Sequence, residues 1–183
     1  YAVGAALASK AIGGKPVKMV LARAEDSRFD SPRSPSVQTL RMAFGEAGRV
    51  TAMEHHCCAG WPTEAMAPFF MPKGANGVAF DPFAINGANH WYTVGAHRVR
   101  AIGNDLANRT FRPGWLRSVG PGFTNWALES FIDEAAAEAK VDPVEFRLRM
   151  LDASGRNAGS APNAVGGAKR QAVKLQAVAD QLI

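Results

Sequence analysis

The order of apolar and polar residues in the first third of the chain predicts a helix, a strand and a β-hairpin. Residues 2–12 are rich in alanine and end at a Gly-Gly pair, as a helix with a glycine C-cap would. Residues 17–23 are apolar and partly β-branched, which favours a strand, and residues 23–35 read as a polar loop. Residues 36–44 alternate between apolar and polar, and a Gly-x-x-Gly turn joins them to a second strand over residues 49–59.

The middle of the chain predicts a long loop followed by a helix. Residues 60–89 combine many Gly, Pro, Phe and Met residues without a clear period, which is typical of a functional or poorly ordered loop. Residues 91–104 read as strand-like pieces. A helix is expected over residues 124–140, because apolar side chains recur there at helical spacing: Ala127, Phe131, Ile132, Ala135 and Ala139.

A second helix start follows directly. Asp142 is a typical N-cap, Pro143 suits the first helical position and Glu145 completes the signal, so a helix is expected to about residue 151. Residues 152–167 read as a loop, and residues 171–183 as a last helix. A hairpin combined with helices predicts the α+β (mixed α/β) class. Because the chain opens and stops inside helical patterns, we expect it to be incomplete at both ends.

The composition is that of a globular domain with a core. The chain has 183 residues, of which 47% are hydrophobic and 20% charged, and no apolar run approaches the roughly 20 residues of a membrane-spanning helix. The net charge is +5, but the basic residues are scattered and no nucleic-acid-binding motif accompanies them. We therefore expect no nucleic-acid partner, while a mildly basic surface favours an anionic cofactor or an acidic partner subunit.

The histidines and cysteines form no recognisable metal or catalytic motif. His55 and His56 are adjacent on a predicted strand, so they point to opposite faces and do not bind one metal together. Cys57 and Cys58 are also adjacent, which disfavours a disulfide and predicts one thiol on each face. We therefore expect no metal ligand among the side chains of this chain.

The most informative stretch runs from Phe111 to Gly122 and reads Phe-Arg-Pro-Gly-Trp-Leu-Arg-Ser-Val-Gly-Pro-Gly. Glycine lets a backbone approach a bound group, and the helix that follows supplies free N–H groups at its start. Arg117 in such a turn suits an oxyanion or phosphate, although composition alone favours a surface turn with a solvated arginine. Glu129 and Asp133 share one face of the next helix, where either Arg117 or a neighbour across the helix is their partner.

At this turn the sequence resembles the large subunit of the molybdenum hydroxylases, the xanthine oxidase and aldehyde oxidoreductase family. These proteins carry a Phe-Arg-Gly-(Phe/Tyr)-Gly turn and then a helix with acidic residues, matched here by residues 116–120 and 129–134. Residues 142–147 match the family's Asp-Pro-x-(Glu/Ala)-(Phe/Leu)-Arg segment. Further family segments match in the same order at residues 14–18, 23–26 and 33–35. The resemblance spans roughly residues 10–152 and is closest to isoquinoline 1-oxidoreductase β subunits and bacterial molybdopterin-dependent aldehyde dehydrogenases.

The resemblance implies a molybdenum–molybdopterin cofactor held at this turn. The residues implied to bind it are Leu116, Arg117, Ser118 and Gly120. Val119 is implied to line the substrate pocket, where xanthine oxidases have an aromatic residue. Residues 81–89, where purine-oxidising members place an arginine, contain none. Aldehydes or N-heteroaromatic compounds are therefore expected as substrates rather than purines.

The implied function is that of a fragment of the cofactor-binding subunit of an oxidoreductase that hydroxylates an aldehyde or N-heteroaromatic carbon with water-derived oxygen. The family's general-base glutamate has no counterpart in this sequence, so no catalytic residue is assigned and the chain alone is expected to be inactive. Residues 1–152 are expected to be part of the molybdopterin-binding domain. Residues 153–183 are expected to lead into the next part of the same subunit.

The resemblance also implies partners and a location. It implies the cytosine dinucleotide form of the cofactor, the remainder of the molybdenum subunit, a small subunit with 2Fe–2S clusters, and a cytochrome c subunit. It implies a periplasmic or membrane-associated enzyme, with the cytoplasm as the alternative. The competing hypothesis is a non-catalytic scaffold domain that docks a partner subunit. Its contact surface would be the large apolar side chains of residues 60–89: Trp61, Phe69, Phe70, Met71 and Phe80.

Overall fold

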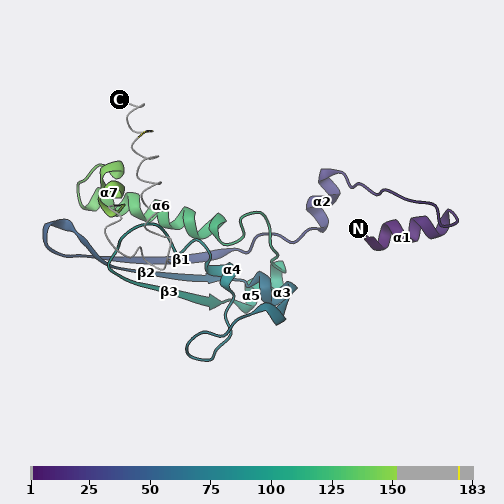
Figure 1. Cartoon of the computed structure of the whole chain (residues 1–183), viewed down its shortest axis with the longest axis horizontal. Helices are drawn as coiled ribbons and strands as arrows, with labels where there is room; N and C mark the ends of the chain where they lie inside the picture. The colour runs from purple at the N-terminus through teal and green to yellow at the C-terminus, as the bar shows by residue number, and fades with distance from the viewer. Residues whose placement is uncertain (1, 152–176, 178–183) are drawn as a thin grey trace. The chain divides into compact units, whose positions relative to one another are not determined.

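The computed structural model describes residues 2–151 and residue 177, and its fold is α+β, as predicted (Figure 1). The chain divides into two compact units, Tyr1–Asp30 and Ser31–Ile183. The loop predicted over residues 152–167 and the helix predicted over residues 171–183 lie outside the described residues, apart from Ala177. The predicted domain boundary at residue 152 stays a prediction.

The first unit begins with the predicted helix. α1 (Ala2–Ala11) is followed by Gly13 and Gly14, which have positive φ angles of 76° and 81°. The Gly14 amide donates to the Ser9 carbonyl (2.8 Å). Glycine adopts this left-handed conformation without steric cost, so the Gly-Gly pair ends the helix as expected.

The strand predicted over residues 17–23 is wrong. Residues 15–22 have no regular structure, and Val20 is 76% exposed. α2 (Arg23–Phe29) replaces the first part of the predicted polar loop, with acidic residues in its first turn and arginine in its last. This charge order suits the helix dipole. The apolar run does not become a strand because no neighbouring strand in the described residues supplies hydrogen bonds to it.

The second unit is built on a three-stranded sheet formed by β1 (Ser36–Phe44), β2 (Val50–Ala59) and β3 (Ala96–Gly103), in that order. β1 and β2 pair antiparallel through a turn that contains the 3-10 helix η1 (Glu46–Gly48), so the predicted hairpin is confirmed. β3 pairs parallel with β2. A parallel pair requires a crossover, which residues 60–95 provide.

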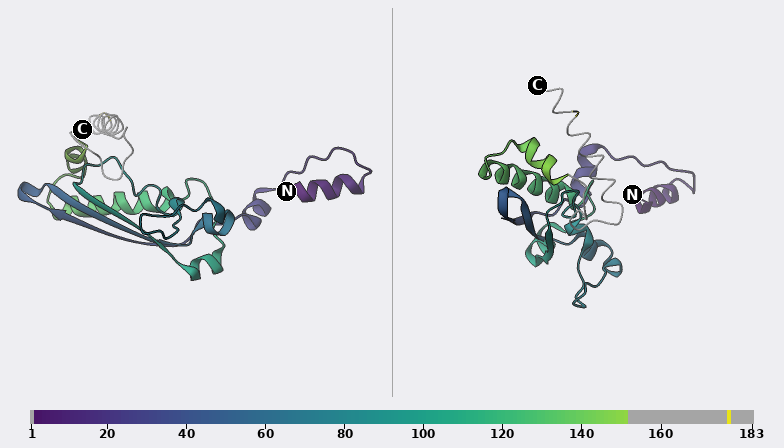
Figure 2. Two further views of the ribbon diagram at one scale, coloured as in Figure 1. Left: turned by 60° about the horizontal axis from the view of Figure 1, so that its bottom comes forward. Right: turned by 60° about the vertical axis from the view of Figure 1, so that its left-hand side comes forward.

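The two faces of the sheet differ in burial. Met53, His55 and Cys57 of β2 are buried, whereas Glu54 and His56 point to the other face, as strand alternation requires. The predicted opposite placement of the adjacent histidines and cysteines is therefore confirmed. Figure 2 shows α6 lying along the sheet, and its contacts with β1 and the shared core place it on the buried face.

The core joins the sheet to the last two helices. α6 (Pro121–Glu138) begins slightly before the predicted start, and α7 (Pro143–Met150) begins as predicted, with Asp142 accepting hydrogen bonds from the Val144 and Glu145 amides. Burial of apolar side chains between these elements is the main stabilising contribution. The buried cluster consists of Val50, Met53, Tyr92, Val94, Leu128, Ile132, Ala135, Ala136, Phe146, Met150 and Leu151.

Short helices flank the sheet where the sequence pattern predicts no regular structure. The crossover carries α3 (Pro62–Met66), the 3-10 helix η2 (Pro68–Phe70) and α4 (Pro82–Ile85). α5 (Asp105–Phe111) follows β3, with the Asn104 side chain accepting from the Ala107 amide at its start. These helices are too short for a hydrophobic period to reveal them.

Candidate cofactor-binding site

The predicted cofactor-binding turn connects α5 to α6 and has an unusual backbone. Ser118 and Val119 have positive φ angles of 69° and 44°, a region that residues other than glycine seldom adopt. The Val119 amide donates to the Leu116 carbonyl (2.7 Å), which closes the turn just before Pro121 starts α6. Strained backbone of this kind persists only where the surroundings fix it, and it clusters at functional sites.

The turn leaves backbone donors unused in front of a helix. In the described part of the chain, the amides of Arg117 and Ser118 have no hydrogen-bond acceptor. They precede the 18-residue helix α6, whose dipole and free N–H groups favour a negative charge at this end. Successive free amides in a turn form a concave site for anionic oxygens. The residues present therefore fit a cofactor that carries phosphate and oxo oxygens.

The side chains of the turn divide between solvent and the interior: Leu116, Arg117 and Ser118 are exposed, Val119 is half-buried and Gly120 is buried. All five predicted site residues thus lie together on one short turn. The polar side chains of Arg117 and Ser118 are exposed, whereas Gly120 is buried. The accessible side of the turn therefore carries its backbone and its arginine.

Residues 81–89, which the family resemblance assigns to substrate recognition, lie against this turn. A side chain at Gly120 would overlap the carbonyl groups of Phe83 and Asn86, so only glycine permits the close approach. The Thr124 hydroxyl donates to the Asn86 carbonyl (2.6 Å) and ties the first turn of α6 to the same segment. Two segments that are far apart in the sequence are therefore adjacent in the fold.

A buried carboxylate holds α3 and α4 beside the turn. Asp81 is fully buried and accepts hydrogen bonds from the Thr63 amide (2.6 Å), the Thr63 hydroxyl (2.6 Å) and the Phe83 amide (2.9 Å). The Trp115 indole N–H donates to the Thr63 hydroxyl (3.4 Å), and its ring centroid lies 5.7 Å from that of Phe83. Asp81 thus supports the turn through Thr63 and Trp115. Asp81 is not among the site residues predicted from the sequence.

The segment just before β1 also holds the turn. The Pro32 carbonyl accepts a hydrogen bond from the Gly114 amide (3.1 Å). The Arg33 side chain donates from Nη2 to the Arg117 carbonyl (2.6 Å). A side chain at Gly122 would overlap the Arg33 guanidinium. The family resemblance includes Arg33, but nothing in the sequence pattern predicts this contact.

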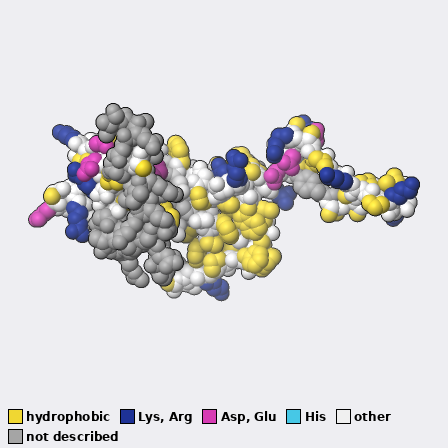
Figure 3. All heavy atoms as spheres, turned by 45° about the horizontal axis from the view of Figure 1, so that its top comes forward, with side chains coloured by type: hydrophobic (Ala, Val, Ile, Leu, Met, Phe, Trp, Pro, Cys, Tyr) yellow, Lys and Arg dark blue, Asp and Glu magenta, His cyan; other side chains and the backbone are white. Residues whose placement is uncertain are grey.

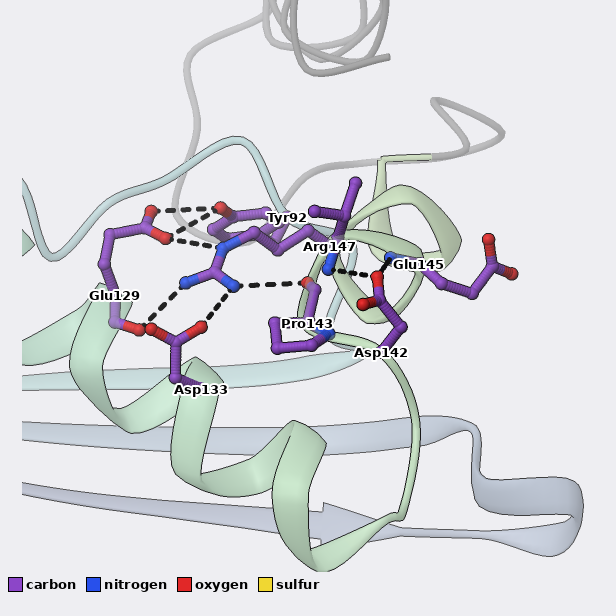
Figure 4. Close-up of polar contacts among 8 residues, drawn as sticks. Tyr92, Glu129, Asp133, Asp142, Pro143, Glu145 and Arg147 are labelled. Carbon is purple, nitrogen blue, oxygen red and sulfur yellow. Dashed lines mark hydrogen bonds and ion pairs between the residues drawn. The ribbon is translucent and has the colours of Figure 1, made fainter. Parts of the chain in front are cut away.

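The acidic residues of α6 pair with Arg147 of α7 (Figure 4). Arg147 donates from Nε to a Glu129 carboxylate oxygen (2.9 Å) and from Nη1 to Asp133, and the Tyr92 hydroxyl donates to Glu129 (3.0 Å). Two partners were possible for Glu129 and Asp133 from the sequence. The prediction of a neighbour across the helix is therefore confirmed, and that of Arg117 is wrong. The two family segments that carry these residues form one structural clamp between α6 and α7.

This clamp keeps its arginine charged. Burial alone would lower the pKa of the Arg147 guanidinium, but hydrogen bonds to Asp133 and Glu129 outweigh burial and raise that pKa. Burial and the neighbouring Glu129 charge raise the pKa of the Tyr92 hydroxyl, so it remains a proton donor. The clamp leaves Arg117 without a carboxylate partner in the described part of the chain.

Burial favours the neutral forms of two histidines and one cysteine of the interior. His55 Nε2 lies 2.8 Å from Gln38 Oε1, and burial lowers the pKa of His55 to about 4. Burial likewise lowers the pKa of His90 to about 3 and raises the pKa of the Cys57 thiol to about 12. Buried groups of this kind favour their uncharged forms. His55 and Cys57 are thus buried on the inner face of β2, and His90 is buried in the segment before β3.

Apolar side chains gather beside the turn. Figure 3 shows them concentrated over the part of the second unit that carries α3 and α4. Phe69 and Phe70 are 80% and 66% exposed, and Trp115 and Leu116 are each 40% exposed. An exposed apolar patch of this kind marks a binding site or an interface. Of the contact residues predicted for a scaffold domain, these two phenylalanines are exposed, whereas Trp61, Met71 and Phe80 are half-buried.

Comparison with known proteins identifies the family. The sequence profile of the molybdopterin cofactor-binding domain matches residues 1–151. The chain belongs to this domain family. Family membership covers α1 through α7, including the 116–120 turn and both segments that support it. The family predicted from the sequence is confirmed.

The chain is similar to parts of several larger enzymes. The chain is 57% identical over 182 residues to the membrane-bound aldehyde dehydrogenase (pyrroloquinoline-quinone) of Gluconacetobacter polyoxogenes, covering 100% of the chain and 24% of that protein. It is 32% identical over 144 residues to the aldehyde oxidoreductase molybdenum-binding subunit of Escherichia coli, covering 79% of the chain and 17% of that protein. It is 28% identical over 147 residues to isoquinoline 1-oxidoreductase subunit beta of Brevundimonas diminuta, covering 79% of the chain and 18% of that protein.

The chain thus spans about a quarter or less of the length of these relatives. The roles of Leu116, Arg117, Ser118, Val119 and Gly120 are predictions that rest on their motif and on the geometry described above. Within the described residues, no helix has the length and apolar character needed to cross a membrane.

Proposed function

We propose that this chain is part of the cofactor-binding subunit of a molybdenum oxidoreductase that hydroxylates an aldehyde or N-heteroaromatic carbon with oxygen derived from water. The observation that carries the proposal is the 116–120 turn, whose Arg117 and Ser118 amides have no acceptor in the described residues. Membership of the molybdopterin cofactor-binding domain family supports it. When bound, the cofactor would supply the two-electron oxidation of the substrate carbon.

Each part of the turn has a proposed role. The amides of Arg117 and Ser118 donate to anionic oxygens of the cofactor, and the exposed Arg117 guanidinium adds a positive charge near them. Leu116 packs against the cofactor, and the half-buried Val119 lines the substrate pocket. Gly120 keeps the turn close to α4. The general base lies outside this chain, so the chain alone is inactive.

The surroundings of the turn favour an apolar carbonyl substrate over a purine. Residues 81–89 lie against the turn and contain no arginine to bind a purine oxygen. The neighbouring exposed side chains, including Phe83 and Trp115, are apolar. Two of the relatives are called aldehyde dehydrogenase and aldehyde oxidoreductase. We therefore favour aldehydes, with N-heteroaromatic compounds as the second class.

The cofactor proposed is molybdopterin in its cytosine dinucleotide form, although the Gluconacetobacter relative is named for pyrroloquinoline quinone. The molybdopterin domain profile matches residues 1–151, and the E. coli relative is named as a molybdenum-binding subunit. Free amides before a long helix suit the phosphates and oxo groups of a molybdopterin. Binding of pyrroloquinoline quinone would not explain why the molybdopterin domain profile matches this chain.

The proposed partners are the remainder of the molybdenum subunit, a small 2Fe–2S subunit and a cytochrome c subunit. Two relatives are themselves named as subunits, which supports an assembly. The exposed Phe69 and Phe70 form a suitable contact surface, because aromatic side chains are enriched at interfaces. A subunit contact at this surface is compatible with an enzyme as well as with a scaffold. The surface therefore does not favour the non-catalytic scaffold hypothesis. The name of the Gluconacetobacter relative, a membrane-bound enzyme, supports the membrane-associated part of the proposed periplasmic or membrane-associated location.

The proposal is tested on the full-length protein purified with its partner subunits. Molybdenum is measured by mass spectrometry, the pterin by the fluorescence of its oxidised form, and turnover with a short aldehyde and an artificial electron acceptor. We expect about one molybdenum and one pterin per subunit, and aldehyde turnover. Arg117→Ala is expected to lower kcat/KM at least about tenfold, because it removes the positive charge proposed to lie beside the anionic oxygens of the cofactor.

Two results would contradict the proposal. One is a purified, active complex that contains pyrroloquinoline quinone and no molybdenum. The other is a complex with molybdenum whose turnover is unchanged by Arg117→Ala, which would remove Arg117 from the site. The exposed Arg100 of β3 provides the matched control, because Arg100→Ala changes the same residue type outside the site.

A further inference from the structure

We propose that Arg33 is a positioning residue that orients and polarises the Ser118 N–H group toward the cofactor. The inference rests on the proposed function of the 116–120 turn. Arg33 precedes β1 and is half-buried, and it lies 84 positions before the residue that it contacts. No part of its side chain needs to touch the cofactor for this role.

Arg33 makes a charge-assisted hydrogen bond to the backbone of the turn. Its Nη2 donates to the Arg117 carbonyl at 2.6 Å, which is short, as expected for a charge-assisted hydrogen bond. The adjacent Pro32 carbonyl accepts from the Gly114 amide at 3.1 Å. Consecutive residues of one segment therefore hold the turn near its beginning and at its centre.

The peptide group that Arg33 holds has a fixed geometry. The Arg117 carbonyl and the Ser118 N–H belong to the same planar trans peptide, so they point in opposite directions. Holding the carbonyl toward Arg33 therefore directs the Ser118 N–H away from Arg33. That amide has no acceptor in the described residues. A cation on the carbonyl also polarises the peptide group, which makes the N–H a stronger donor.

A glycine of α6 makes room for the Arg33 side chain. Gly122 lies in the first turn of α6, where its backbone does not require a positive φ angle. Glycine in a helix is less favourable than alanine, by up to about 1 kcal/mol in a helix interior. An added side chain would overlap the Arg33 guanidinium, whose Nε is itself buried without a hydrogen-bond acceptor in the described residues. Gly122 therefore leaves room for the Arg33 side chain, and it is not needed for an unusual backbone conformation.

The turn also has a strained backbone. Ser118 and Val119 occupy the left-handed region with φ angles of 69° and 44°. Residues with side chains remain there only when other contacts hold them. Arg33 holds the peptide group immediately before these two residues, and the carbonyls of α4 confine Gly120 immediately after them. Loss of Arg33 would thus release the turn at the peptide that donates to the cofactor.

The experiment uses the full-length holoenzyme and four variants: Arg33→Ala, Arg33→Lys, Gly122→Ala, and the double variant of Arg33→Ala with Gly122→Ala. Molybdenum and pterin retained after prolonged dialysis are the primary readout, with turnover per bound molybdenum as the second. The melting temperature of cofactor-depleted protein reports stability separately. Arg100→Ala is the control for removing an arginine from the surface.

We expect Arg33→Ala to lose the cofactor about tenfold faster than the wild type, since one charge-assisted hydrogen bond is involved. Arg33→Lys should restore part of the retention. Gly122→Ala should also lose cofactor faster, while its cofactor-depleted form melts at the same or a higher temperature, because alanine favours the helix. A purely structural role of Arg33 cannot produce this combination. In the double variant, Gly122→Ala should add no further loss of cofactor.

Wild-type retention in both Arg33→Ala and Gly122→Ala would overturn this inference and leave the proposed function intact. Additive losses in the double variant would overturn it as well, because Gly122 would then act without Arg33. A wild-type complex without molybdenum or pterin would instead overturn the proposed function, and this inference with it.

Discussion

Two arginines of the same unit lie in opposite surroundings. Arg147 is held by Glu129 and Asp133, and only 13% of its side chain is exposed. Arg117 has an exposed side chain, and the contact that the structure gives it is made by its backbone carbonyl. The Arg147 clamp uses side-chain charges to join two helices. The Arg117 turn is instead held by its neighbours, and its own donors stay unused.

The backbone shows the same contrast. In the clamp, Asp142 and Pro143 start α7 as their helix preferences predict. In the turn, Ser118 occupies a left-handed conformation where the family motif has glycine. Local preference and structure therefore agree in the clamp and disagree in the turn. Such disagreement is expected where function, rather than stability, has selected the conformation.

The largest effect is expected from removing the buried support of the turn. Asp81→Ala leaves the buried Thr63 amide without an acceptor and uncaps α4, which should destabilise the protein by about 3 kcal/mol. Asp142→Ala is the matched control, because it removes an exposed cap of α7 and should cost about 1 kcal/mol. Melting temperatures of the full-length variants measure the difference. Equal effects would show that burial of Asp81 adds nothing to the support of the turn.

The next effect concerns the clamp. Arg147→Met should destabilise the protein by about 2 kcal/mol, because it unpairs Glu129 and Asp133, although both carboxylates are partly exposed and screened by solvent. Arg149→Met removes an exposed pair with Glu145 and should cost less than about 0.5 kcal/mol. Chemical denaturation measures both. Cofactor content of the folded Arg147→Met protein should equal that of the wild type, and a selective loss of cofactor would erase the distinction between clamp and turn.

The sequence predicts the regular part of this structure well. Residues 36–59 alternate, and the hairpin follows; Asp142-Pro143 starts α7 as predicted. The same signal occurs at Asp81-Pro82, but α4 is only four residues long and lies in a stretch without a hydrophobic period. The apolar residues 17–20 fail as a strand, since a strand needs a partner that local sequence does not contain.

The candidate site is predictable only in part for a similar reason. Glycine, proline and arginine at residues 112–122 indicate an anion-binding turn, because each acts locally. The supports of the turn are not local. Arg33 reaches Arg117 across 84 positions, and Thr63 reaches Trp115 across 52. Neither contact has a period or spacing in the sequence, so only the fold reveals them.

The buried face of the sheet and the charged clamp are expected to respond differently to low pH. Burial lowers the pKa of His55 from 6.5 to about 4, so between these values the unfolded chain binds a proton that the folded chain does not. Stability should therefore be full above pH 6.5 and should fall by up to about 1.4 kcal/mol per pH unit toward pH 4. His55→Gln should flatten this dependence by that amount, measured by denaturation at several pH values. The charge of Arg147 persists throughout this range, because its pKa is raised. An unchanged dependence in His55→Gln would assign the acid sensitivity to other groups.

The smallest effect tests the strain in the turn itself. Ser118→Gly restores the glycine of the family motif at a φ angle of 69°, which glycine adopts without steric cost. Release of this strain is partly offset by the greater freedom of glycine in the unfolded chain, so a net stabilisation of about 0.5 kcal/mol is expected. Ser36→Gly, in the extended backbone of β1, should instead destabilise. If Ser118→Gly were also destabilising, the serine side chain would contribute a contact that outweighs its backbone strain. The turn would then resemble the clamp, in which side chains supply the stabilising interactions.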